Sequence, residues 1–376
     1  MSALWFQMGA AVVGFALFGR LRRLGTATAP SPMTDAPEVA VIIPARNEAA
    51  SIGNLLSDIA SLDVAPAMVI VVDDHSDDAT ASIASSFDVE VITAPALPVG
   101  WRGKPWACQL GADHAMSQLA PDDLLVFLDA DVRLHPAALQ AVVGAAAEGD
   151  VVSVQPFHEL PTAVEQLSAV FNVVSLMGVG AGTASPTAVF GPVICCTTRQ
   201  YRAVDGHRSV RAAVAEDVEL GRRFLQADVA LQVFGGGELV RFRMYPTGLS
   251  AIVEGWSKNM ATGATSIPLS RTVGAAWWIS SLVAASWTYL SLVVGAASPT
   301  APTLLATAVG GLGLAALLRR VGSFRWWAML AYPVLVAFFV AVFVRSLWLT
   351  YVRRAVNWRG RTLDLGDDPT TTPAVP

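Results

Sequence analysis

The sequence predicts an α/β domain built on a mainly parallel sheet and held at a membrane by apolar segments on both sides of it. Of the 376 residues, 53% are hydrophobic and 15% are charged, whereas soluble domains usually carry about a quarter charged residues. The charges are segregated, because residues 35–271 hold 27 acidic and 14 basic side chains while the two flanks together hold 3 and 11. Between the flanks, β-branched runs alternate with helical patterns. An acidic domain between apolar, Arg-rich flanks is not the pattern of a nucleic-acid-binding protein.

Residues 1–23 are expected to form a transmembrane anchor. The first 19 residues carry no charge and are followed by Arg20, Arg22 and Arg23. A cleaved signal peptide has its charges before the apolar run and a small-residue cleavage site after it, and this segment has neither. Because cytoplasmic flanks of membrane helices are rich in Arg and Lys, the following domain is expected in the cytoplasm.

The domain over residues 35–245 has the element order of a sheet covered by helices. Continuous apolar strands that alternate with helices indicate a mainly parallel sheet. We expect strands at 39–43, 68–72, 89–92, 124–128 and 151–154, and helices at 48–60, 78–86, 104–118 and 136–148. In such sheets, ligands bind at the carboxyl ends of the strands, so the residues after each strand are the candidate site.

Polar clusters follow three of these strands: PARNE (44–48), DDHSDD (73–78) and DAD (129–131). Asp129 and Asp131 flank one residue of a segment that we expect to be extended, so both carboxylates can point to the same side. Two such carboxylates suit Mg²⁺ or Mn²⁺ bridging a diphosphate, although an acidic pair taken alone is more often a solvated turn.

The two acidic pairs of the cluster DDHSDD (73–78) are expected to have different roles. Asp73 and Asp74 can accept a base N–H or hold a ribose hydroxyl, whereas a helix cap is the favoured role of Asp77 or Asp78. No glycine-rich dinucleotide or P-loop motif accompanies these clusters.

Two further motifs open helices. Glu216-Asp217 begins a helix with an apolar face, where Asp217 either caps the helix or acts as general base on an acceptor hydroxyl. The loop around Trp101 and Lys104 combines an aromatic ring and a cation at a helix start, which is either an anion site or a surface loop with a buried Trp. The three cysteines and five histidines show no metal-ligand spacing. We expect Cys195 and Cys196 in an apolar strand and the histidines in turns or at the surface.

The C-terminal part is expected to associate with the membrane. Residues 246–271 predict an amphipathic helix that lies in the membrane interface or packs on the domain core. Residues 272–352 form a transmembrane region of two or three spans: 47 residues from 272 to 318 carry no charge, which is enough for two spans of about 20 residues. A third apolar run, 326–344, has Arg-rich flanks at both ends, and whether it spans the membrane or is re-entrant stays open. Residues 353–376 form a basic tail.

Five motifs in a fixed order carry a family resemblance: PARNE (44–48), VVDDHSDD (71–78), GWRGKPWA (100–107), FLDADVRL (127–134) and AEDVEL (215–220). With apolar spans after them, the chain resembles the membrane-bound glycosyltransferases of family 2, which have the GT-A fold. The GWRGKPWA segment is most similar to the branch that glycosylates carotenoids and related isoprenoid lipids, which includes the diaponeurosporenoate and hopene-associated glycosyltransferases. The resemblance covers nearly the whole chain.

The resemblance implies an inverting transfer from a nucleotide sugar, a UDP-hexose, to a lipid acceptor at the cytoplasmic face of the inner or plasma membrane, by a multi-pass protein in contact with membrane lipids. It implies that residues 35–245 are the catalytic domain, that Asp217 is the catalytic base, and that Asp129 and Asp131 hold Mg²⁺ or Mn²⁺. The nucleotide-sugar contacts that it implies are Pro44, Arg46, Glu48, Asp73, Asp74, Lys104 and Asp129.

The chain departs from the family at one motif. The usual QxxRW is missing, and EGWSKN (254–259) occupies its place. We assign acceptor or diphosphate contacts to Trp101, Glu216, Trp256 and Lys258. The terminal NWRGR (357–361) resembles a Trp–Arg motif of processive members and favours a cytoplasmic C-terminus. A polysaccharide synthase and a non-catalytic membrane assembly protein remain alternatives, and the sequence does not specify an oligomeric state.

Overall fold

The computed structural model describes residues 2–25, 37–265, 267–296, 300–353, 355–358 and 361–364. These residues form two compact units, each assembled from segments distant in sequence. We call residues 22–157 and 186–243 the sheet unit, and residues 1–21, 158–185 and 244–376 the helical unit. Residues 158–185 therefore lie outside the sheet unit, although the sequence places them within the domain 35–245.

The sheet unit is built on eight strands in the order β1-β10-β7-β9-β5-β2-β3-β4. Only β9 runs antiparallel to its neighbours, so the sheet is mainly parallel as predicted. The strands are β1 (Arg22–Arg23), β2 (Val39–Ala45), β3 (Met68–Asp73), β4 (Glu90–Thr93), β5 (Leu124–Leu128), β7 (Val151–Gln155), β9 (Val193–Thr197) and β10 (Leu231–Gly235). Cys195 and Cys196 lie in β9 and are buried, as expected. A separate three-stranded sheet has the order β6-β11-β8, in which β6 (Val132–Leu134) and β11 (Val240–Phe242) are antiparallel. Strand β8 (Phe157–His158) carries the chain into the helical unit.

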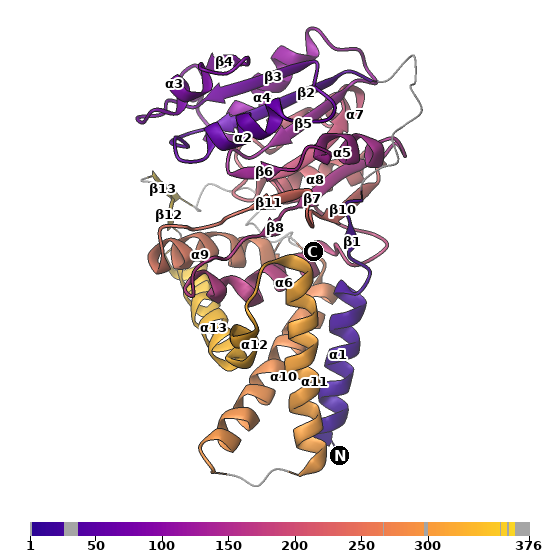
Figure 1. Cartoon of the computed structure of the whole chain (residues 1–376), viewed down its shortest axis with the longest axis vertical. Coiled ribbons are helices and arrows are strands. Elements are labelled where there is room, and N and C mark those ends of the chain that lie inside the picture. The colour runs from indigo at the N-terminus through magenta and orange to yellow at the C-terminus, as the bar shows by residue number, and fades with distance from the viewer. Residues whose placement is uncertain are drawn as a thin grey trace. The chain divides into compact units, whose positions relative to one another are not determined.

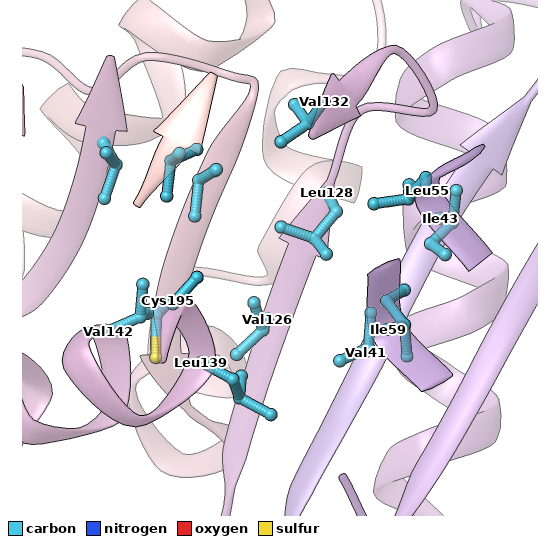
Figure 2. Packing of buried hydrophobic residues seen from close by; sticks show 14 of the residues in the cluster. Val41, Ile43, Leu55, Ile59, Val126, Leu128, Val132, Leu139, Val142 and Cys195 are labelled. Atoms are coloured by element: carbon cyan, nitrogen blue, oxygen red, sulfur yellow. The ribbon is translucent and has the colours of Figure 1, made fainter. Parts of the chain in front are cut away.

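Helices cover both faces of the sheet, because successive strand residues point to opposite sides. Val41 and Ile43 of β2 belong to one buried cluster, with apolar residues of α2 (Ile52–Ala60) and α5 (Ala138–Ala146), as Figure 2 shows. Ile42 belongs to the other cluster, with residues of α4 (Gly103–Met116) and α8 (Glu216–Gln226). A Cβ on Gly111 of α4 would lie 2.6 Å from Ile42 Cγ2, so glycine permits this close helix–strand contact. The remaining helices of the unit are α3 (Thr80–Ala84), α7 (Thr198–Ala203) and the 3₁₀ turn η2 (Gly206–Val210).

The expected helix over 48–60 begins late, at Ile52. Asn47 adopts a left-handed φ of 54°, and the N–H of Glu48 donates to Thr80 Oγ1 at 2.8 Å rather than entering a helix. Residues 47–50 therefore form a loop at the end of β2, which is where the candidate site lies.

The helical unit consists mainly of apolar helices, which are labelled in Figure 1. They are α1 (Ser2–Phe18), η1 (Glu165–Ser168), α6 (Ala169–Val179), α9 (Leu249–Thr265), α10 (Leu269–Val293), α11 (Ala301–Val321), α12 (Trp326–Leu330), α13 (Tyr332–Trp348) and the π-helical turn η3 (Leu349–Arg353), followed by the hairpin β12 (Ala355–Trp358) and β13 (Arg361–Asp364). Helix α1 packs on α10 and α11, and α6 contacts all the longer helices of the unit.

Two helices, α10 and α11, are long and apolar enough to cross a membrane by length and composition. They correspond to the two spans predicted within residues 272–318. The apolar helix α1 has 17 residues, at the short end of what a span needs. The third apolar run is not one helix, because it is broken between α12 and α13, next to Pro333. Arg354, Arg359, Gly360 and residues 365–376 of the predicted basic tail lie outside the described residues.

Candidate active site

The three polar clusters predicted from the sequence meet at one edge of the sheet. Strands β5, β2 and β3 are parallel neighbours. The register pairs Ala45 at the end of β2 with Asp73 at the end of β3, and Asp129 follows the last residue of β5. Because parallel strands end at the same edge, the loops that begin at Arg46, Asp74 and Asp129 lie together there, as predicted.

Arg46 and two buried aspartates form one side of the site. Arg46 Nη1 lies 3.0 Å from the carbonyl oxygen of Asp74 and 3.4 Å from its Oδ2. Asp73 Oδ2 accepts the N–H of Ser76 at 3.2 Å, whereas its Oδ1 is buried and has no hydrogen-bond partner among the described residues. A buried acceptor of this kind is costly unless a donor reaches it, so Asp73 is suited to receive an N–H or O–H of a ligand.

The loops after β2 and β3 are held by hydrogen bonds that acidic side chains accept. Glu48 Oε2 accepts the Ser51 hydroxyl at 2.9 Å. Asp78 Oδ1 accepts the N–H of Thr80, the first residue of α3, at 2.9 Å. Asp78 therefore accepts the first N–H of α3, but the N-cap residue is Ala79, which makes no side-chain cap bond, so the predicted N-cap role of Asp77 or Asp78 is wrong.

Asp129 and Asp131 lie in a tight turn. The N–H of Val132 donates to the carbonyl of Asp129 at 3.2 Å, and residues 130 and 131 are the turn residues between β5 and β6. The expectation of an extended segment is therefore wrong, because the chain reverses here to start β6. Both carboxylates still lie at the carboxyl end of β5.

Lys104 connects this turn to the start of α8. Its Nζ lies 2.6 Å from Asp129 Oδ1 and 3.7 Å from Glu216 Oε1. Burial lowers the pKa of Lys104, but the carboxylates of Asp129 and Glu216 outweigh burial and raise the pKa above its ordinary value. Lys104 is therefore a permanent cation between the two acidic motifs, and the predicted anion site at the start of α4 is filled by protein carboxylates.

Asp217 lies in the first turn of α8, beside that cation. Its Oδ2 accepts the N–H of Gly191 at 3.0 Å, and its Oδ1 accepts the N–H of Val218 at 2.9 Å. Burial and the negative charge of Glu216 raise the pKa of Asp217 to about 6, against the lowering effect of Lys104 and the two N–H groups. A carboxylate with this pKa is suited to general base catalysis near neutral pH.

Some of these residues line a pocket in the sheet unit, whereas Arg46, Asp73, Asp74 and Asp131 are not part of its lining. Its charged lining residues are Lys104, Asp129, Glu216 and Asp217, and most of the others are apolar. The full lining is Pro44, Lys104, Cys108, Phe127, Leu128, Asp129, Gly191, Ile194, His207, Glu216 and Asp217.

The sequence interpretation missed His207, which it placed in a turn or at the surface. His207 is 2% exposed, and its Nδ1 lies 2.8 Å from the hydroxyl of Tyr201. Burial, reinforced by the charge of Lys104, lowers the pKa of His207 to about 3, so the ring is neutral. His158, in the helical unit, is also fully buried. No sequence pattern around either histidine indicates that its side chain is buried.

The GWRGKPWA loop supports the start of α8. Arg102 Nε donates to the carbonyl of Ala212 at 2.7 Å, and its backbone N–H donates to the carbonyl of Arg211 at 2.8 Å. Trp101 is partly buried and packs edge-on against Trp106, with ring centroids 5.0 Å apart. The motif therefore positions the segment that leads into Glu216.

Trp256 and Lys258 belong to α9 of the helical unit. Trp256 is 4% exposed, stacks on Phe171 with ring centroids 5.0 Å apart, and donates from Nε1 to Ser168 Oγ at 3.2 Å. The side chain of Lys258 lies outside the described part of the chain. An acceptor contact by either residue stays a prediction.

The donor set at Asp129 and Asp131 fits a divalent ion that is shared with a substrate. No group of three His, Cys, Asp or Glu side chains that could hold a metal by themselves occurs among the described residues. Mg²⁺ is commonly bound by one or two carboxylates together with substrate phosphates. The pair of aspartates at the end of β5 matches that arrangement.

Comparison with known proteins identifies the family. A family model described as "Glycosyl transferase family 2" matches residues 40–166. The 4,4′-diaponeurosporenoate glycosyltransferase of Staphylococcus aureus strain USA300 is 32% identical over 340 residues, which cover 87% of this chain and 88% of that protein. Its counterpart in strain MRSA252 is 31% identical over 345 residues, with the same coverage.

A solved structure shares the fold. The mannosyltransferase PcManGT from Pyrobaculum calidifontis, determined in complex with GDP-Man and Mn²⁺, aligns with a TM-score of 0.52 over 91% of this chain and 99% of that chain, at 18% sequence identity. The predicted GT-A fold is thereby confirmed, and with the extended sequence identity to the staphylococcal enzymes it follows that this chain is a glycosyltransferase that belongs to family 2.

Proposed function

We propose that the chain transfers a sugar from a nucleotide-sugar donor, a UDP-hexose, to a carotenoid or related isoprenoid lipid, with inversion at the anomeric carbon. The observation that carries the proposal is the cluster in which Lys104 joins Asp129 to Glu216 beside Asp217, whose pKa is raised to about 6. The acceptor class comes from the staphylococcal relatives, which are named for 4,4′-diaponeurosporenoate.

The donor's nucleoside fits the side of the site formed by Arg46, Asp73 and Asp74. Asp73 Oδ1 is a buried acceptor without a partner among the described residues, and it can accept an N–H of the base or a ribose hydroxyl. Pro44 lines the pocket and Glu48 lies in the loop after β2, so both are proposed to contact the donor.

The diphosphate fits the polar side of the pocket. Asp129 and Asp131 would hold Mg²⁺ or Mn²⁺ together with the diphosphate, as the Mn²⁺ in the P. calidifontis complex supports. When bound, the ion would neutralise charge on the departing nucleoside diphosphate. Lys104 and Glu216 lie beside this position.

Asp217 is the proposed base for a hydroxyl acceptor. The acceptor oxygen would attack the anomeric carbon, the bond from that carbon to the diphosphate oxygen would break, and Asp217 would take the hydroxyl proton. With a pKa of about 6, Asp217 is mostly ionised at neutral pH. A carboxylate acceptor has no such proton and would need no base. Trp101, which is partly buried, is proposed to contact the acceptor.

The helical unit is proposed to hold the enzyme in the inner or plasma membrane. Helices α10 and α11 have the required length and composition, and α10 exposes large apolar side chains such as Trp287, which is 76% exposed. Arg319 and Arg320 at the end of α11, with Arg22 and Arg23 after α1, favour a cytoplasmic sheet unit under the positive-inside rule. Helix α9 is proposed to lie near the interface.

Lipid profiling tests the proposal. Membranes from cells that express the wild-type chain should contain isoprenoid lipids heavier by one hexose, and membranes with the Asp129→Ala/Asp131→Ala variant should not. Purified membranes supplied with UDP-hexose or GDP-hexose identify the donor. A sugar polymer in place of a monoglycosylated lipid would overturn the proposal in favour of a polysaccharide synthase.

A further inference from the structure

The ammonium group of Lys104 lies between two carboxylates that come from distant parts of the sheet unit. Asp129 follows β5 and approaches Nζ to 2.6 Å, whereas Glu216 opens α8 and lies 3.7 Å away. The three side chains are 35%, 27% and 15% exposed, respectively. The site is therefore open enough for a ligand and sheltered enough for charge interactions to be strong.

The geometry gives Lys104 two alternative anionic partners. Its stem leaves the first turn of α4 and ends beside Gly191, where an added Cβ would lie 3.0 Å from Nζ. A lysine side chain is a point charge on a flexible stem. From its position on Asp129, the ammonium can move toward Glu216 or toward a new anion in the pocket without any backbone change.

A divalent ion and Lys104 compete for the same carboxylate. An ion on Asp129 would need oxygen lone pairs that now face the ammonium at 2.6 Å. Two cations at this separation repel one another strongly in a partly buried site. A metal ion that arrives alone must displace Lys104, whereas one that arrives with a diphosphate brings an anion to which Lys104 can transfer.

We propose that Lys104 is a resident cation that neutralises Asp129 in the free protein and transfers to the donor's diphosphate when donor and divalent ion bind together. The consequence is ordered binding: the free enzyme holds metal weakly, and the diphosphate makes the metal site available. This inference rests on the proposed function, since it takes the donor to be a nucleoside diphosphate sugar.

Mn²⁺ binding to the purified full-length chain in detergent tests the inference without any measurement of turnover. Bound Mn²⁺ is quantified by electron paramagnetic resonance in three conditions: alone, with inorganic pyrophosphate, and with UDP, after correction for Mn²⁺ complexed in solution. The wild-type chain should bind Mn²⁺ weakly alone and at least about tenfold more tightly with either diphosphate.

Lys104→Met removes the charge and keeps most of the stem. It should bind Mn²⁺ alone at least about tenfold more tightly than the wild-type chain, because the competing cation is gone, and should depend less on the diphosphate. Lys104→Arg keeps the cation and should bind Mn²⁺ as weakly as the wild-type chain. Arg199→Met removes a cation from an exposed ion pair with Asp122 and is the matched control, with unchanged Mn²⁺ binding.

The outcomes separate this inference from the proposed function. A second variant, Lys104→Gln, accompanies Lys104→Met. If both variants unfold at the wild-type temperature but bind Mn²⁺ no more tightly than wild type, the resident-cation role is wrong. If wild type still binds UDP in that case, the proposed function stands. If wild type binds neither UDP nor pyrophosphate at any Mn²⁺ concentration, the proposed donor site fails, and the inference fails with it.

Discussion

Asp217 Oδ2 accepts the backbone N–H of Gly191 at 3.0 Å, so the candidate base at the start of α8 is held by the segment that leads into β9. The absence of a side chain at residue 191 leaves room for the ammonium group of Lys104 beside this contact. An added Cβ would lie 3.4 Å from Asp217 Oδ2 and 3.0 Å from Lys104 Nζ. Gly191 thus sets the spacing between the base and the cation, although no sequence motif marks it.

Gly191→Ala is expected to lower kcat by about tenfold or more, because displacement of a catalytic group by a fraction of an ångström to 1 Å is enough to cost that factor. The unfolding temperature should change little, since the neighbours are side chains at the pocket surface. Steady-state kinetics with a fixed acceptor measure the effect. Gly313→Ala, where nothing lies within 4 Å of the added Cβ, should keep wild-type kcat. Equal kcat in the two variants would contradict the spacing role.

Asp217→Asn is expected to distinguish hydroxyl from carboxylate acceptors. With a hydroxyl acceptor the variant should lose at least about 100-fold in kcat, the usual contribution of a general base. With a carboxylate acceptor it should lose little, because no proton has to leave. Parallel assays with one lipid alcohol and one lipid carboxylate make the comparison. Glu219→Gln is the control on the same helix, because Glu219 pairs with Arg222 at 3.0 Å and does not line the pocket.

The pH profile of the wild-type enzyme follows from the raised pKa of Asp217, about 6. The base is active only when ionised, so kcat/KM with a hydroxyl acceptor should rise with pH through about 6 and level off above it. The acidic limb should be missing with a carboxylate acceptor that stays ionised over this range. An acidic limb of the same midpoint in the Asp217→Asn variant would show that another group titrates there.

The parallel strands and the convergence of three clusters were predictable because both depend on local patterns. Continuous apolar runs identify buried parallel strands, and the carboxyl ends of such strands meet at one edge. The antiparallel insertion of β9 between β5 and β7 was not predictable, because pairing between strands so distant in sequence leaves no local mark. The left-handed φ of Asn47, which delays the start of α2, is also a tertiary effect.

The acidic residues of the site were predictable from the sequence, but the contacts that join them through Lys104 were not. Asp129 and Asp217 lie in recognisable motifs, whereas the approach of Lys104 to both Asp129 and Glu216 depends on how α4 and α8 pack on the sheet. His207 was misplaced for the same reason, because its burial depends on the packing of η2 and Tyr201.

His207→Asn is expected to make the protein less sensitive to acid. The pKa of His207 is about 3 in the folded chain and 6.5 in the unfolded chain, so the unfolded chain binds more protons between these values. The stability that His207 contributes is therefore lost as pH falls below 6.5, by about 1.4 kcal/mol per pH unit. Because the pKa of Asp217 is raised, Asp217 adds stability to the folded chain as pH falls from about 6 to 3.8. Both proteins contain Asp217, so the difference between their stabilities isolates the contribution of His207.

Unfolding temperatures of the full-length chain in detergent, measured from pH 8 to pH 4, check this comparison. The Asn side chain can replace His207 Nδ1 in the hydrogen bond with the Tyr201 hydroxyl, because an amide can donate or accept. The loss of stability at high pH is therefore limited. The difference between the wild-type and variant temperatures should narrow as pH falls below 6.5. If the difference between the two unfolding temperatures were constant across this pH range, the His207 ring would not be held neutral in the folded chain.

Arg102→Gln is expected to lower kcat by about tenfold while leaving donor KM nearly unchanged, because Arg102 holds the segment before Glu216 rather than contacting the donor. Arg202→Gln is the matched control: Arg202 donates to the carbonyl of Met116, which is not a pocket residue. Initial rates at varied donor concentration separate the two parameters. A rise in donor KM with constant kcat would indicate that Arg102 contacts the donor directly.

Leu312→Arg is expected to weaken membrane insertion. Leu312 is 71% exposed in the middle of α11, and an Arg at the centre of a membrane helix costs about 2.5–3.5 kcal/mol. The fraction of chain that resists alkaline carbonate extraction should fall. Val64→Arg introduces the same charge between α2 and β3 of the sheet unit, where Val64 is 45% exposed, and should extract as wild type does. If α11 faced water instead, an Arg at position 312 would cost as little as one at position 64. The two variants would then resist carbonate extraction to the same extent.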